Sequence, residues 1–139
     1  LELKTEMDPS IAPVRGDRRL LKQLLLNLLT NAIKYNRAGG EVVVSLRSAA
    51  AEVVMSVQDT GRGIDPGDVA HLFERFYRVR EVEGEAEVPG TGLGLAIARR
   101  IAESHQGVIT VESQLGQGSV FSVHLPAESL AAVSTRPRG

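Results

Sequence analysis

The chain has 139 residues, a formal net charge of −1, 42% hydrophobic residues and no cysteine. This length fits a single domain, and a net charge near zero gives no indication of a nucleic-acid or anionic-membrane partner. The absence of cysteine excludes disulfides and thiolate metal sites, and no apolar run is long enough to span a membrane. Because the sequence starts at Leu1 rather than at Met, we expect it to be a piece of a longer protein.

The first third of the chain predicts strands followed by a long helix. Apolar and polar residues alternate over 1–7, which is typical of a half-buried strand, and 11–14 predicts a second short strand. Asp17 is suited to cap a helix. Leucines spaced three and four residues apart then predict an amphipathic helix from Arg18 to about Asn36.

The middle of the chain predicts a hairpin, a short helix and a lid. Alternating valines over 41–47 and 52–58 predict two strands joined by residues 48–51. A short helix is expected over 65–74. Residues 80–88 are acidic and weakly apolar, so we expect a mobile loop there.

The last third predicts a second long helix over 93–104 and a hairpin with strands at 108–113 and 119–125. We expect one domain over 1–126 and a flexible tail over 127–139. Because helices do not alternate strictly with strands, a doubly wound parallel sheet is disfavoured. A mixed sheet covered on one face by helices is the expected fold.

A glycine-rich segment, Gly90-Thr91-Gly92-Leu93-Gly94-Leu95, comes directly before the second long helix. Free N–H groups at a helix start can bind anions, so this segment is a candidate phosphate loop. No Gly-Lys pair is present, which excludes the nucleoside-triphosphate P-loop, and Leu95 occupies the place of the last glycine of the dinucleotide fingerprint. From these residues alone, a phosphate loop and an ordinary glycine-rich turn remain equally open.

Polar residues at two further places could contribute to a site. Asn27, Asn31 and Lys34 lie on one stripe of the first long helix, where the amides could face a ligand or metal or could simply be solvated. Asp59 ends a strand and precedes a Gly-x-Gly turn, so its carboxylate could point into a cleft or could form a plain Asp turn.

Aromatic residues and histidines favour structural roles. Phe73, Phe76 and Tyr77 form a cluster that is more typical of a small core plug than of a binding site. The three histidines, His71, His105 and His124, share no metal-ligand spacing, so we interpret them as structural or surface residues.

Five segments, read together and in order, resemble the motifs of the catalytic ATP-binding domain of two-component sensor histidine kinases, within the GHKL superfamily. They are the N box (Asn27–Tyr35), the first glycine box (Asp59–Gly63), the F box (Leu72–Arg78), the second glycine box (Gly90–Leu95) and a closing Gly-Ser element (Gly116–Ser119). The resemblance implies the Bergerat fold. This is a two-layer α/β (α+β) sandwich, with a mixed, mostly antiparallel sheet of about five strands, three helices on one face and an ATP lid.

The resemblance implies a role for each matching residue. Asp59 would accept a hydrogen bond from the exocyclic amine of adenine, and Gly61 and Gly63 would make room for the base. Asn31 and Asn27 would supply amide oxygens to Mg²⁺, a cation that prefers oxygen ligands.

The phosphates would be held by Lys34, Arg78 and the backbone N–H groups of the second glycine box, and Tyr35 would line the nucleotide pocket. The residues expected to act in catalysis are Asn27, Asn31, Lys34 and Arg78. The further residues expected to contact ATP are Ile64, Phe73, Tyr77, Gly90, Thr91, Gly92, Leu93, Gly94, Leu95 and Ser119.

The implied function is transfer of the γ-phosphate of Mg-ATP to a histidine on a separate dimerisation and phosphoacceptor domain, for relay to a response regulator. The parent protein would be a membrane-anchored bacterial homodimer with this domain in the cytoplasm. Asn27 stands where superfamily members that hydrolyse ATP carry a Glu, and an amide cannot act as a general base, so slow hydrolysis is expected. Gln106 departs from the family, in which a glycine commonly follows this histidine.

Three alternatives remain open from the sequence. The first is a GHKL ATPase of the gyrase or MutL kind, and the second is an anti-sigma-type Ser/Thr kinase on the same scaffold. The third is a non-catalytic nucleotide-binding module that serves for docking.

Overall fold

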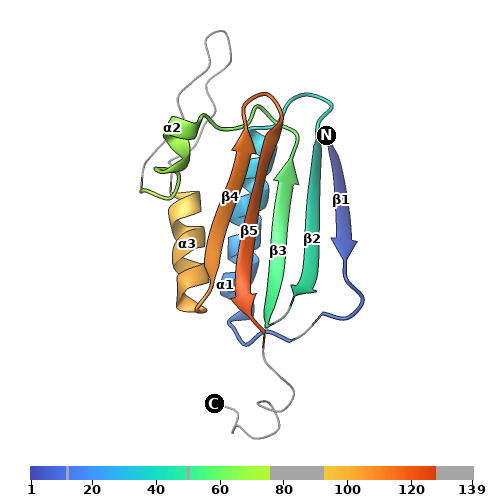
Figure 1. The fold of residues 1–139 in the computed structure, drawn as a ribbon, viewed down its shortest axis with the longest axis vertical. Helices are drawn as coiled ribbons and strands as arrows, with labels where there is room; N and C mark the ends of the chain where they lie inside the picture. Colours follow the sequence, from blue (N-terminus) through green and yellow to red (C-terminus); the bar gives the residue numbers. More distant parts are fainter. Residues whose placement is uncertain (12, 50, 76–92, 128–139) are drawn as a thin grey trace, which may run out of the picture.

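Five strands form one sheet with the order β1-β2-β3-β5-β4, in which β1 runs parallel to β2 and all other neighbours are antiparallel (Figure 1). The computed structural model describes residues 1–139 except 12, 50, 76–92 and 128–139. The strands are β1 (Glu2–Met7), β2 (Glu41–Ala49), β3 (Glu52–Asp59), β4 (Val108–Gln114) and β5 (Gly118–Pro126).

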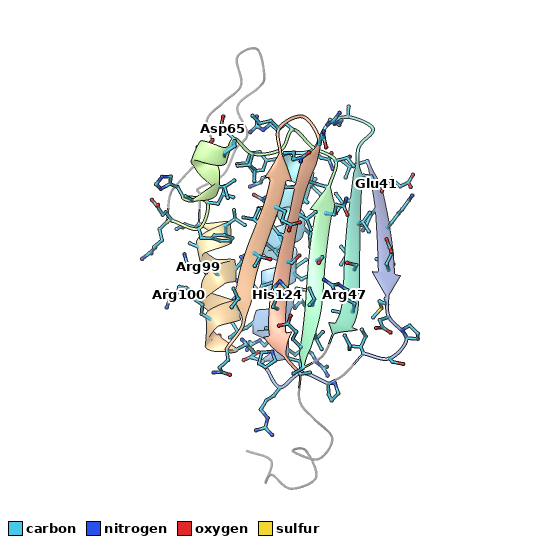
Figure 2. All side chains as sticks on the ribbon, viewed as in Figure 1. Glu41, Arg47, Asp65, Arg99, Arg100 and His124 are labelled. Atoms are coloured by element: carbon cyan, nitrogen blue, oxygen red, sulfur yellow. The ribbon has the colours of Figure 1, made fainter. Side chains whose placement is uncertain are left out.

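Helices cover one face of this sheet and leave the other face open. In Figure 1, α1 (Arg18–Lys34) lies behind the sheet, and α3 (Gly94–Ser104) lies to the left of β4, where it packs against α1, with the short α2 (Pro66–Val69) above it. The described residues therefore confirm the expected two-layer fold with a mixed, mostly antiparallel sheet. Figure 2 shows that the open face carries polar side chains such as Arg47 and His124.

The first long helix forms where the leucine spacing predicts it. The Asp17 carboxylate accepts hydrogen bonds from the backbone N–H groups of Arg19 at 2.9 Å and Leu20 at 3.2 Å, which satisfies two donors that have no partner within the helix. Leu24 and Leu28 are buried on the face toward the sheet. The helix ends at Lys34, two residues before the predicted end.

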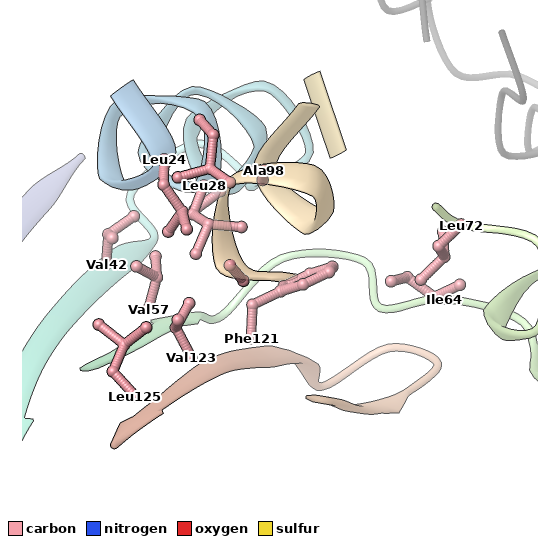
Figure 3. Packing of buried hydrophobic residues seen from close by; sticks show 13 residues of the cluster. Leu24, Leu28, Val42, Val57, Ile64, Leu72, Ala98, Phe121, Val123 and Leu125 are labelled. Atoms are coloured by element: carbon pink, nitrogen blue, oxygen red, sulfur yellow. The ribbon is translucent and has the colours of Figure 1, made fainter. Parts of the chain in front are cut away.

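The hydrophobic core lies between the helices and the sheet (Figure 3). Leu24 and Leu28 of α1 meet Val57 of β3 and Phe121 of β5, all of them almost fully buried. Phe73 packs edge-on against Phe121 with ring centroids 6.3 Å apart, which confirms the core role expected for this aromatic residue. Phe76 and Tyr77 lie outside the described residues.

The short strand expected at 11–14 is not present in its described residues, 11 and 13–14. Pro13 has no backbone N–H to donate to a sheet. The edge of the sheet is formed instead by β1, in which Glu2 pairs with Glu41 and Met7 pairs with Leu46 in parallel register. Such pairing between distant segments leaves no local signal in the sequence.

The helix expected over 65–74 is much shorter than predicted. Asp65 caps it by accepting a hydrogen bond from the N–H of Gly67 at 2.8 Å, but the helix ends at Val69. Beyond it, backbone hydrogen bonds join residues three apart, from His71 to Asp68 and from Glu74 to His71. This tighter pattern is typical of consecutive turns and not of a continuing α-helix.

The end of α3 is closed by a residue in the left-handed backbone region. Gln106 has a φ of 56°. Its N–H donates to the carbonyl of Glu103, and the N–H of Gly107 donates to the carbonyl of Ala102 at 2.8 Å. This pair of bonds is the Schellman arrangement, which usually places glycine at the position that Gln106 occupies.

Two expected segments fall on parts of the chain that the structure does not describe. The lid expected at 80–88 and all but the first residue of the tail expected at 127–139 lie outside the described residues. Within the described ranges, no helix has the length and apolar character needed to cross a membrane.

Candidate functional site

Asp59 ends β3 as a buried carboxylate, with 5% of its surface exposed. One carboxylate oxygen accepts a hydrogen bond from the N–H of Gly61 at 2.9 Å. Burial raises the pKa of Asp59 above its ordinary value, although hydrogen bonds from the backbone of Gly61 and Ser119 act in the opposite direction. A carboxylate held in this way has acceptor capacity left for a ligand that donates hydrogen bonds.

The first glycine turn follows Asp59 and packs tightly against neighbouring loops. A Cβ atom on Gly61 would lie 2.2 Å from the carbonyl oxygen of Tyr35. Gly63 has a φ of +73°, and a Cβ atom on it would lie 2.1 Å from the carbonyl oxygen of Gln114. The room that these two glycines provide is therefore used by the protein's own backbone, a constraint that the motif did not reveal.

A pair of serines supports this turn from the β4–β5 hairpin. The Ser113 hydroxyl lies 2.8 Å from the Ser119 hydroxyl and accepts a hydrogen bond from the N–H of Ile64 at 2.7 Å. Ser119 is buried and pairs with Asp59 across β3 and β5. The structure thus brings the expected residues Asp59, Ile64 and Ser119 together. Ser113 was missed because no sequence pattern links it to Ile64.

Asn27 of α1 contacts the start of α3. The side-chain amide of Asn27 donates a hydrogen bond to the carbonyl oxygen of Gly94 at 3.1 Å. This bond uses the NH₂ group and leaves the amide oxygen as the remaining acceptor. Asn31 is half-buried one turn further along α1, and Lys34 is exposed near its C-terminal end.

Tyr35 lies between α1 and the first glycine turn. Its carbonyl oxygen accepts a hydrogen bond from the N–H of Arg62 at 3.3 Å. The Arg62 guanidinium lies over the Tyr35 ring, 4.9 Å from the ring centroid. Arg62 was not expected to contribute, because its position inside the glycine motif does not indicate a partner from α1.

The second glycine box is described only from Leu93 onward. Leu93 is the N-cap of α3 and makes no side-chain capping bond, and Gly94 and Leu95 begin the helix. Tyr77, Arg78, Gly90, Thr91 and Gly92 lie outside the described residues. Figure 1 places α2, the end of β3, the β4–β5 turn and the start of α3 at the same end of the molecule.

The geometry at this end of the sheet has counterparts in known proteins. Residues 16–129 match the family model of histidine kinase-, DNA gyrase B- and HSP90-like ATPases. The sensor histidine kinase RppB of Synechocystis sp. is 43% identical over 133 residues, which cover 96% of this chain and 29% of RppB. The chain therefore spans under a third of that curated relative.

Solved structures show the same fold. The mycobacterial sensor histidine kinase MprB superposes with a TM-score of 0.77 at 30% identity, covering 92% of this chain and 86% of the MprB chain. Full-length ShkA in complex with AMPPNP also gives a TM-score of 0.77, at 31% identity, and covers 92% of this chain and 26% of the ShkA chain. The chain belongs to the histidine kinase-, DNA gyrase B- and HSP90-like ATPase family, and within it is a catalytic ATP-binding domain of the sensor histidine kinase type.

Proposed function

We propose that this domain binds Mg-ATP and donates its γ-phosphate to a histidine on a separate dimerisation and phosphoacceptor domain, for relay to a response regulator. The observation that carries the proposal is the buried Asp59 carboxylate beside the first glycine turn. The AMPPNP bound by ShkA, a protein with the same fold, supports a nucleotide as the ligand. The parent protein would be a membrane-anchored homodimer with this domain in the cytoplasm.

Adenine recognition is assigned to Asp59. The carboxylate would accept a hydrogen bond from the exocyclic amine of adenine, while Gly61 keeps its own bond to one carboxylate oxygen. Guanine and hypoxanthine carry an oxygen in place of that amine and would meet the carboxylate with repulsion. Ile64, Tyr35, Phe73 and Ser119 would line or support the same pocket.

Magnesium and phosphate binding are assigned to α1 and the start of α3. The donor set fits the ion, because Asn27 and Asn31 offer neutral amide oxygens and Mg²⁺ binds oxygen ligands together with phosphates. The bond from the Asn27 amide to Gly94 would hold that oxygen in place beside the phosphate-binding segment. Bound Mg²⁺ would neutralise phosphate charge.

Phosphate contacts are assigned to Lys34, Arg78 and the N–H groups of the second glycine box. The start of α3 supports this assignment, because its first-turn N–H groups have no side-chain cap from Leu93. The remaining proposed contacts in this segment and the lid are Tyr77, Gly90, Thr91, Gly92, Leu93, Gly94 and Leu95.

Transfer to a protein is favoured over hydrolysis because of Asn27. Its amide cannot remove a proton from water near neutral pH, so the domain lacks a general base at this position. Catalysis would then rest on positioning and charge neutralisation by Asn31, Lys34 and Arg78. A measurement of ATP turnover separates this proposal from a gyrase-like ATPase, which would show steady hydrolysis.

Calorimetric titration of the chain with ATP and Mg²⁺ tests the proposal directly. We expect saturable binding that Asp59→Asn weakens by about tenfold or more, since a charge-assisted hydrogen bond contributes about 1.5–3 kcal/mol. The same chain should then phosphorylate a histidine-bearing dimerisation domain added in trans. A folded protein without affinity for ATP would overturn the proposal.

A further inference from the structure

Arg37 joins two loops at the end of the sheet that carries the candidate site. It follows α1 on the connection to β2, and its Nη2 donates hydrogen bonds to the carbonyl oxygens of Gly61 at 3.0 Å and Gly116 at 2.8 Å. Gly61 belongs to the first glycine turn, and Gly116 belongs to the β4–β5 turn. One guanidinium group therefore binds the backbone of both turns.

These bonds complete a closed set of contacts around Asp59. The N–H of Gly116 donates to the carbonyl of Arg62 at 2.8 Å, so the two turns are also bonded directly to each other. Within the first glycine turn, the N–H of Gly61 donates to the Asp59 carboxylate. The Gly61 backbone is thus held by Arg37 through its carbonyl and by Asp59 through its N–H.

A neighbouring network holds the same turn at a second point. Asn36 donates from its side-chain amide to the carbonyl of Glu41 at 3.0 Å, and Thr60 accepts a bond from the N–H of Glu41 at 2.8 Å. Those contacts anchor Thr60 to β2 without reaching the β4–β5 turn. The Arg37 side chain, in contrast, reaches the β4–β5 turn as well as the Gly61 turn.

We propose that Arg37 is a positioning residue for base recognition: it holds the Gly61 turn so that the Asp59 carboxylate faces the exocyclic amine of adenine. The inference rests on the proposed function. A guanidinium suits this task because its planar set of donors binds two carbonyls in a defined geometry. Hydrogen bonds from a charged donor are also stronger than neutral ones.

Arg37 can be tested without disrupting the core. Its side chain is exposed and does not belong to the core cluster, so the domain should fold without it. A residue that only stabilised the fold would affect every nucleotide equally. A residue that positions Asp59 would affect ATP, which has the amine, more than ITP, which lacks it.

The experiment measures Kd values for ATP and ITP, each with Mg²⁺, on the full chain by calorimetry. Arg37→Ala and Arg37→Lys are compared with Arg47→Ala, an arginine on β2 toward the other end of the sheet from Glu41 and Asp65 (Figure 2). For Arg37→Ala we expect a Kd for ATP raised about fivefold to tenfold, a Kd for ITP changed less than twofold and a protein that is still folded at the temperature of the titration. Arg37→Lys should recover part of the loss, and Arg47→Ala should match the parent chain.

A second comparison tests whether Arg37 acts through Asp59. In a chain that already carries Asp59→Asn, adding Arg37→Ala should change the Kd for ATP less than twofold, because the two changes remove the same interaction. The inference would be overturned if Arg37→Ala weakened ATP and ITP binding equally, so that the ratio of the two Kd values stayed as in the parent chain. A parent chain that binds ATP and ITP equally well would instead overturn the proposed role of Asp59.

Discussion

His105 accepts a hydrogen bond at Nε2 from the backbone N–H of Asp17, a residue 88 positions earlier, at 2.9 Å. Its Nδ1 lies 2.8 Å from the carbonyl oxygen of Ile101, to which it donates. The buried ring thus joins the end of α3 to the N-cap of α1. Gly16 permits this approach, because a Cβ atom there would lie 2.5 Å from the ring. The structural role expected for this histidine is confirmed.

Replacement of His105 by Ala should lower the free energy of unfolding by about 2 kcal/mol or more. The Asp17 N–H would lose its partner, the ring would leave a void, and the cap of α1 would lose its anchor. Unfolding in urea, monitored by circular dichroism, gives the value. The control is His71→Ala, which removes an exposed ring whose Nδ1 is paired with the exposed Glu74 carboxylate and should change stability by less than about 0.5 kcal/mol. Equal effects of the two changes would contradict this assignment.

Replacement of Gln106 by Gly should stabilise the domain. Gln106 adopts a φ of 56°, which costs a residue with a Cβ about 1–2 kcal/mol and costs glycine nothing. The greater freedom of glycine in the unfolded chain offsets part of the gain, so a net increase of about 0.5–1 kcal/mol is expected. Gln106→Val should act in the opposite direction, because β-branched residues tolerate this region least. The unfolding temperature should therefore be highest for Gln106→Gly, intermediate for the parent chain and lowest for Gln106→Val.

Replacement of Gly63 by Ala should be far more harmful than the same change at Gly39. Both glycines have a positive φ, +73° and +75°, so both changes carry a similar backbone cost. A Cβ on Gly63 would also collide with the Gln114 carbonyl, whereas nothing lies within 4 Å of a Cβ on Gly39. We expect a loss of about 1 kcal/mol at Gly39 and at least about 2 kcal/mol more at Gly63, measured by urea unfolding without nucleotide. Comparable losses would show that the β4–β5 turn can move aside.

Asp59 should make the stability of the nucleotide-free domain depend on pH. Burial raises the pKa of this carboxyl in the folded state. The folded protein therefore keeps the proton to a higher pH than the unfolded chain does. Between the unfolded pKa, about 3.9, and the raised folded value, stability contributed by this group falls as pH rises.

Asp59→Asn isolates that contribution. The amide oxygen can still accept the bond from Gly61, but the side chain cannot ionise. Subtracting the unfolding free energy of the variant from that of the parent, at a series of pH values, removes the effect of the other carboxylates. The unfolding free energy of the parent minus that of the variant should decrease as pH rises through this window, and should be constant above it. A difference that grew in favour of the parent would show that the folded pKa is lowered.

Several elements of this fold were predictable because their signals are local. The leucine spacing and the Asp17 cap together predict α1, and alternating valines predict β2 and β3. Predictions that depended on weak local patterns of only a few residues were wrong. The 65–74 segment shortened to four helical residues, Pro66–Val69, and 11–14 did not form a strand in its described part.

The amino-acid sequence by itself determined the family, the order of the elements and the residues that form the motifs around Asn27, Asp59 and Gly94. These features depend on residue type and on short-range periodicity, which are present in the chain before it folds. The tertiary structure alone decided that β1 pairs in parallel with β2, that Asp59 is buried, and that Arg37 reaches Gly61 and Gly116. The physical reason is that these contacts join residues far apart in the chain, so their partners are selected by packing and not by any local pattern.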